Sequence, residues 1–163
     1  MKTLLLLRHA KSSWGNAGLD DHDRPLNKRG KHDAPRMGEL LVQQGLVPDL
    51  LVTSTAKRAR KTATAVAEAC GYAGDVVEMS DLYLASPDEC MHVLRTLPDQ
   101  FTSALLVAHN PGLEQLLFRL TGSEEVMATA TLAQIALPIS QWNDVALNGD
   151  ATLVSIWRPR ELA

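Results

Sequence analysis

The sequence predicts an α/β fold: a three-layer α/β/α sandwich in which helices cover both faces of a mainly parallel sheet. Short apolar runs of strand length alternate along the chain with longer segments whose apolar residues recur at helical spacing. Several of the short runs are apolar along their whole length, which is typical of strands buried on both faces of a parallel sheet. The length of 163 residues suits one domain, and we expect residues 1–163 to form a single domain.

The first expected strand is an apolar run that ends abruptly on Arg8 and His9. The polar stretch 12–25 that follows is long enough to be a functional loop rather than a simple connection. The expected strands are residues 2–7, 49–53, 76–79, 103–108, 131–137 and 152–157.

The expected helices lie between these strands and begin or end at typical residues. Gly45 ends the first helix, and Ser54 or Thr55 can cap the second. Pro87 occupies the start of the third, a favoured place for proline. The expected helices are about 26–44, a segment from 56 to before the turn at 71–74, about 87–97, and about 113–120.

The composition argues against several classes of function. A formal net charge of −3 gives no reason to expect binding to nucleic acid or to an anionic membrane. Basic residues nevertheless concentrate in the first part of the chain, which suits a small anion better than a polyanion. Cys70 and Cys90 show no metal-ligand or redox spacing, so we interpret them as reduced core thiols. We find no signal peptide and no run long enough to span a bilayer, and expect a cytoplasmic protein.

Three strand ends, or the first helical turns after them, are expected to bring Arg8, His9, Arg58 and His109 to one edge of the sheet. Two guanidiniums can each bind phosphate oxygens through paired hydrogen bonds, so a phosphate dianion fits this set best. The amino termini of the helices after the second and fourth strands would add N–H donors. A histidine between the arginines can attack phosphorus through a neutral ring nitrogen, and water can then resolve the phosphohistidine that forms.

Four segments carry these residues in order along the chain. They are Leu7-Arg8-His9-Ala10-Lys11-Ser12, Leu26-Asn27-Lys28-Arg29-Gly30, the Ser-x-x-x-Arg-Ala-x-x-Thr-Ala block at 54–63, and Val107-Ala108-His109-Asn110-Pro111-Gly112. Together they resemble the motifs of the histidine phosphatase superfamily, which includes phosphoglycerate mutases and acid phosphatases. The small size, Arg-His-Ala, His-Asn-Pro-Gly and the segment 82–87 are similar to its SixA-like phosphohistidine phosphatase branch.

The resemblance implies a phosphoglycerate mutase-like fold and assigns roles to the matching residues. It implies His9 as nucleophile, with Arg8, Arg58 and His109 holding the phosphate. Further expected contacts to the phosphate or the substrate are Lys11, Ser12 and Asn110.

Two departures from the family pattern bear on the reaction. Ala10 stands where the family has glycine, and we expect ordinary backbone angles there. Mutase-like members carry a glutamate as general acid between the second arginine and the second histidine. Here that interval offers Glu78, Asp81, Asp88 and Glu89 without a clear match, and Glu78 and Asp81 are the first candidates. An alkoxide needs a proton to leave, whereas a ring-protonated phosphohistidine releases a neutral imidazole, so a missing acid favours phosphohistidine.

The leading hypothesis is a phosphatase that hydrolyses protein-borne phosphohistidine or small phosphomonoesters and releases inorganic phosphate, without a metal or cofactor. Its expected partner is a phosphohistidine-bearing protein or a small phosphorylated substrate. Two alternatives stay open: a phosphate- or phosphoprotein-binding module without turnover, and a mutase or phosphatase that acts on a small metabolite.

The other polar and aromatic residues receive plainer interpretations. The loop carboxylates Asp20, Asp21 and Asp23 are interpreted as solvated, although one of them could position water or donate a proton. Surface or loop positions are expected for His22, His32 and His92. Packing or rim positions are expected for Trp14, Trp142 and Trp157.

Overall fold

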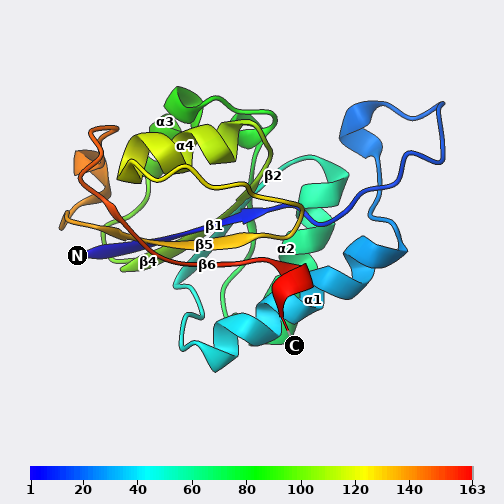
Figure 1. Cartoon of the computed structure of the whole chain (residues 1–163), viewed down its shortest axis with the longest axis horizontal. Helices are drawn as coiled ribbons and strands as arrows, with labels where there is room; N and C mark the ends of the chain where they lie inside the picture. Colours follow the sequence, from blue (N-terminus) through cyan, green and yellow to red (C-terminus); the bar gives the residue numbers. More distant parts are fainter. Residues whose placement is uncertain (163) are drawn as a thin grey trace.

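The computed structural model describes residues 1–162, which form one six-stranded sheet with helices on both faces (Figure 1). The strands lie in the order β3-β2-β4-β1-β5-β6; the first four are parallel, and β5 and β6 pair antiparallel at one side. The strands are β1 Lys2–Arg8, β2 Leu50–Ser54, β3 Val77–Met79, β4 Ser103–Ala108, β5 Leu132–Leu137 and β6 Thr152–Trp157. The predicted α/β sandwich with a mainly parallel sheet is confirmed.

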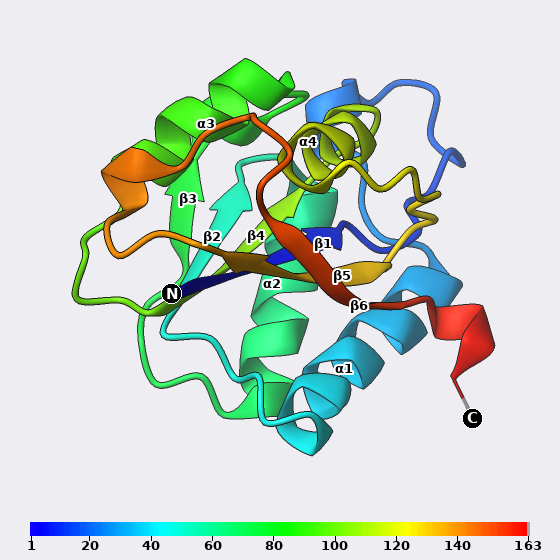
Figure 2. The ribbon, with the colours of Figure 1, turned by 60° about the vertical axis from the view of Figure 1, so that its left-hand side comes forward.

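Two helices cover each face of the sheet (Figure 2). Within residues 1–162 the α-helices are α1 Lys28–Gln43, α2 Lys57–Cys70, α3 Pro87–Arg95 and α4 Gly112–Thr121. The side chains of β1 alternate between the two cores. Leu4 and Leu6 belong to the core under α3 and α4, and Leu5 and Leu7 to the core under α1 and α2. All four are buried, so β1 lies at the centre of the molecule.

Element boundaries lie within two residues of the predicted ones, but the predicted cap of α2 was wrong. The helix begins at Lys57 with Ala56 as its N-cap residue, and no side chain caps it. Ser54 is instead the last residue of β2, and its Oγ accepts a hydrogen bond from the N–H of Ala56. The Ser54 hydroxyl therefore stabilises the turn before the helix and also contacts His109.

The register of the sheet brings the carboxyl ends of β1, β2 and β4 together. Arg8 pairs with Ala108, the residue before His109, and Thr53 of β2 pairs with Val107 of β4. The residues that follow these three strands therefore meet at one edge of the sheet, as the α/β topology requires.

Two glycines allow the backbone to pass close to itself beside this edge. A Cβ on Gly30, at the start of α1, would lie 2.1 Å from the carbonyl oxygen of Lys11. A Cβ on Gly112, at the start of α4, would lie 2.0 Å from the carbonyl oxygen of Ala85. Any other residue would push these loops away from the strand ends.

The remaining expectations concern core and surface. Cys70 and Cys90 are buried free thiols, and Trp142 is fully buried, whereas Trp14 is exposed and stacks on the guanidinium of Arg24. Across residues 1–162, no helix has both the length and the apolar character needed to cross a membrane.

Candidate active site

His9 follows β1 directly, and one of its ring nitrogens is committed to the backbone. Nδ1 lies 2.8 Å from the carbonyl oxygen of Ala10, so we assign the ring proton to Nδ1, which donates it to this oxygen. The lone pair of the neutral ring then lies on Nε2. Burial, together with the charges of Arg58 and Arg8, lowers the pKa of His9 from 6.5 to about 4. At neutral pH the ring is therefore uncharged.

The backbone that orients His9 is tied to the second arginine through a threonine of α2. The N–H of Ala10 donates to Thr62 Oγ1 at 2.9 Å, and the Thr62 hydroxyl donates to the carbonyl of Arg58 at 2.7 Å. All three side chains are buried. The position of His9 therefore depends on the packing of α2 against β1.

His109 follows β4, and its ring centroid lies 5.1 Å from that of His9. Its Nε2 is 2.7 Å from Ser54 Oγ, which already accepts a hydrogen bond from Ala56. The Ser54 proton is thus available for Nε2, which assigns the ring proton to Nδ1. That buried Nδ1 has no hydrogen-bond partner within residues 1–162 and can donate to an anion. Burial and the nearby His9 and Arg58 lower the pKa of His109 to about 3.

The two arginines are each held from one end of the guanidinium. Arg8 donates from Nη1 to the carbonyl of Met127 at 3.1 Å, and its buried Nε has no partner in the described chain. Arg58 is only 3% exposed and donates from Nη1 to the carbonyl of Asp21 at 2.7 Å and from Nη2 to the Asp21 carboxylate at 3.0 Å. These bonds leave the Nε–H edge of each arginine, which can bind phosphate oxygens in pairs.

Asp21 closes the site beside Arg58. It lies in the short 3-10 turn Asp21–Asp23 of the long polar loop. Oδ1 accepts a hydrogen bond from Arg24 at 2.8 Å, and Oδ2 accepts one from the Tyr83 hydroxyl at 2.5 Å in addition to that from Arg58. The Tyr83 ring meets the ring of His109 edge-on, with centroids 5.5 Å apart.

The expectation of a plainly solvated loop was therefore wrong for Asp21. Partial burial acts against ionisation, but hydrogen bonds from Tyr83, Arg24 and Arg58 outweigh it and hold the pKa of Asp21 well below its ordinary value. An acid that is ionised at neutral pH is no proton donor there. His22 lies in this loop, as expected; its Nε2 is 2.9 Å from Thr55 Oγ1, and its ring packs on Tyr83. The other two histidines, His32 and His92, are exposed as expected.

The three further residues expected to contact phosphate are arranged differently from one another. The Lys11 side chain is exposed, and the Ser12 hydroxyl is buried and accepts a hydrogen bond from Arg24. The side-chain amide of Asn110 donates to Glu114 at 3.0 Å and to the carbonyl of Met127 at 2.9 Å. Both amide hydrogens are thus engaged, and Asn110 holds the carbonyl that also binds Arg8 rather than facing the site.

The candidate general acids lie apart from the four central residues. Glu78 is paired with Arg60 at 3.8 Å, and Asp88 with Arg119 at 3.7 Å. Glu89 belongs to the capping box of α3, and Asp81 lines a surface hollow with Asp88, Glu89 and His92. Within residues 1–162, Asp21 is the acid joined by hydrogen bond or ion pair to Arg58, and none is so joined to Arg8, His9 or His109.

Sequence reasoning missed the residues that hold the central four in place. Ser54 and Thr62 lie inside the Ser-x-x-x-Arg-Ala-x-x-Thr-Ala block, and Tyr83 lies in the segment 82–87, so these motifs contained the signal. No spacing rule singles out Asp21 among its acidic neighbours, because two of its partners, Arg58 and Tyr83, lie 37 and 62 residues away along the chain.

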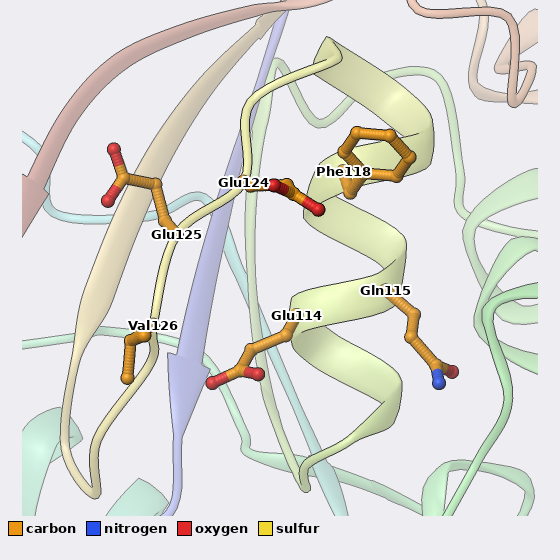
Figure 3. A pocket seen from close by; sticks show the side chains of 6 residues that line it. All are labelled: Glu114, Gln115, Phe118, Glu124, Glu125 and Val126. Atoms are coloured by element: carbon orange, nitrogen blue, oxygen red, sulfur yellow. The ribbon is translucent and has the colours of Figure 1, made fainter.

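A separate hollow of about 420 Å³ lies between α4 and the segment that follows it (Figure 3). Its lining residues are Glu114, Gln115, Phe118, Glu124, Glu125 and Val126. The hollow is connected to the site only through hydrogen bonds. Glu114 accepts them from the side-chain amide of Asn110 and from the N–H of Met127, whose carbonyl binds Arg8. None of the four central residues lines it.

Comparison with known proteins agrees with the motifs. Residues 4–83 match the model of the histidine phosphatase superfamily, branch 1. An uncharacterized protein of Mycobacterium tuberculosis is 32% identical over 94% of this chain and 100% of its own length. A SixA from Agrobacterium tumefaciens, assigned as a phosphohistidine phosphatase, superposes with a TM-score of 0.83 at 27% identity, over 97% of this chain and 98% of that one. A 2,3-bisphosphoglycerate-dependent phosphoglycerate mutase of Thermobifida fusca is 42% identical, but over only 44% of this chain and 30% of the mutase.

Proposed function

Because this chain belongs to the histidine phosphatase superfamily, we propose that it is a SixA-like phosphatase that hydrolyses protein-borne phosphohistidine through a phosphohistidine intermediate on His9. The observation that carries this proposal is the state of His9. Its Nδ1 is hydrogen-bonded to the Ala10 carbonyl, and the ring is neutral, with the lone pair on Nε2 and the charges of Arg8 and Arg58 nearby. A neutral imidazole beside two fixed guanidiniums is suited to attack on a phosphoryl group.

The same residues account for binding of the phosphoryl group. The free Nε edges of Arg8 and Arg58 and the Nδ1–H of His109 are donors for its oxygens. The amino termini of α2 and α4 add positive dipole ends. Donors that are already oriented stabilise the charge of the transferring group without reorganisation, which is the main catalytic contribution expected for phosphoryl transfer.

The reaction takes two steps. In the first, the Nε2 lone pair of His9 forms a bond to phosphorus, while the phosphorus–nitrogen bond of the substrate breaks and its electron pair stays on the leaving imidazole. The leaving ring already carries a proton on its other nitrogen, so it departs neutral. In the second, water attacks phosphorus, the electron pair of the N–P bond returns to Nε2, and hydrogen phosphate leaves with release of a proton.

In this mechanism the chain's own cations neutralise the phosphate dianion, and no metal takes part. A chelator should therefore leave kcat unchanged. Loss of activity on treatment with a chelator, restored by a divalent ion, would contradict this part of the proposal.

The proposal is tested by turnover of a phosphohistidine protein, a phosphoserine peptide and an aryl phosphate, each with wild type and His9→Ala. We expect preference for phosphohistidine and loss of all turnover in the variant. Good activity on phosphoserine would indicate a working general acid and contradict the preference. No turnover of any substrate, with tight binding of phosphate, would indicate a binding module. Mutase activity is the less favoured reading, because the mutase relatives match less than half of this chain.

A further inference from the structure

The carboxylate of Asp21 is partly exposed and accepts a hydrogen bond from Arg58, the buried arginine expected to hold the phosphoryl group. Resting on the proposed function, we propose that Asp21 accepts a hydrogen bond from the ring N–H of a protonated phosphohistidine. This interaction makes the site selective for phosphorus–nitrogen over phosphorus–oxygen substrates.

The position of Asp21 follows from its contact with Arg58. Oδ2 lies 3.0 Å from Arg58 Nη2, so one guanidinium separates this carboxylate from a phosphoryl group on the Nε edge. The side chain of Arg58 is 4% exposed and that of Asp21 is 42% exposed. His9, His109 and Arg58 are all buried, so the leaving group must point toward solvent. Asp21 is a partly exposed carboxylate joined directly to Arg58, and we infer that it lies beside the leaving group.

The groups around Asp21 keep it negative and leave no proton for an alkoxide. Facing it are Arg24 from its own turn, Arg58 from α2, and Tyr83 from the loop before α3, with His109 behind the tyrosine ring. His22 and Asp23 are its neighbours in the turn, and they lie 3.8 Å from each other. The Tyr83 proton is committed to Asp21, and burial together with this carboxylate raises the pKa of Tyr83.

A fixed negative charge at this place affects the two kinds of substrate in opposite ways. The phosphohistidine ring is cationic when its second nitrogen is protonated, and a carboxylate stabilises that form and keeps the proton in place as the P–N bond breaks. Negative charge develops on the oxygen of a departing alcohol, and the same carboxylate repels it. Because no proton moves in the first case, Asp21 needs to remain ionised throughout.

The test compares wild type, Asp21→Asn and Asp23→Asn on three substrates: a phosphohistidine peptide, phosphoramidate and p-nitrophenyl phosphate. Asp23 is the matched control, since it lies in the same turn and, among residues 1–162, its side chain pairs only with His22, at 3.8 Å. We expect Asp21→Asn to lower kcat/KM on the phosphohistidine peptide roughly ten- to a hundredfold more than on the aryl phosphate or on phosphoramidate, which has no ring N–H; this is the effect of losing a hydrogen bond to a charged group. Asp23→Asn should leave that ratio unchanged.

A pH profile separates this role from simple support of Arg58. In wild type, kcat on the phosphohistidine peptide should fall as the ring of the bound substrate loses its proton, because kcat reports ionisations of the enzyme–substrate complex. In Asp21→Asn the fall should begin about one pH unit lower. Tyr83→Phe keeps the carboxylate but removes the hydrogen bond that Tyr83 donates to it, so the carboxylate becomes more basic and the fall should begin at a slightly higher pH. This variant serves as the readout if Asp21→Asn fails to fold.

The outcomes separate failure of the role of Asp21 from failure of the proposed function. An equal loss on all three substrates with an unmoved profile, or no loss at all, would overturn the role of Asp21 while leaving the proposed function intact. Absence of phosphohistidine turnover in wild type would instead overturn the proposed function, and the inference with it.

Discussion

Thr62 provides a direct test of how His9 is held in place. Its Oγ1 is the acceptor for the buried N–H of Ala10, whose carbonyl in turn accepts the Nδ1 proton of His9. Thr62→Val preserves the branched shape but leaves that N–H without a partner. A buried unsatisfied donor costs about 1–3 kcal/mol, which is a substantial part of the roughly 5–15 kcal/mol by which domains are stable. We expect the free energy of unfolding, measured by urea denaturation, to fall by about 2 kcal/mol.

Thr62→Ser is the matched control for this prediction. It retains the hydroxyl and loses one buried methyl group, at a cost of about 1 kcal/mol. With the best substrate of wild type, kcat/KM should fall at least about tenfold in Thr62→Val, because His9 loses its orientation, and should be nearly retained in Thr62→Ser. If the valine variant is as stable and as active as the serine variant, the hydroxyl does not position His9 and the reasoning fails.

Three further predictions concern the histidines and the loops around them. After correction for ionisation of the substrate, kcat/KM should stay constant as the pH falls through 6.5 and should drop only near the pKa of His9, about 4. A drop near pH 6.5 would instead show that His9 titrates as a solvated histidine. Unfolded His9 takes up a proton below about pH 6.5, whereas folded His9 does so only below about pH 4. As the pH falls from 6.5 to 4, the free energy of unfolding should therefore decrease by up to about 3 kcal/mol. His9→Gln should lessen that decrease in parallel urea titrations. Gly112→Ala forces a Cβ against the carbonyl of Ala85, so it should lower Tm and weaken phosphate binding measured by calorimetry, whereas Gly149→Ala, with nothing within 4 Å but a positive φ, should cost stability without affecting binding.

The sequence was sufficient to predict that the residues at the ends of the strands lie together. Arg8, His9 and His109 follow buried apolar runs directly, and parallel strands of an α/β sheet end at one edge, so the topology alone brings them together. Their roles as nucleophile and phosphate ligands stay predictions for the experiments above.

The supporting residues could not be predicted in the same way. Tyr83 meets Asp21 across 62 residues, between two loops without hydrophobic periodicity. Ser54 satisfied the rule for a helix cap, but the turn before α2 is two residues longer than that rule assumes, and the hydroxyl is directed to His109 instead. Glu78 and Asp81 lie in the right interval of sequence, yet the strand and turn that carry them place their side chains at the surface.

The central place of β1 in the sheet has a consequence for how the protein is made. This strand leaves the ribosome before its partners β4 and β5, which begin about 100 and 130 residues later. At a synthesis rate of roughly 5–20 residues per second, a run of four leucines waits several seconds or more for the strands that bury it. Pairing over such sequence distances is slow, and an exposed apolar strand aggregates readily. During that interval the nascent chain is expected to depend on chaperones that bind short apolar segments, and changes that delay β4 should reduce soluble yield more than the stability of the finished protein.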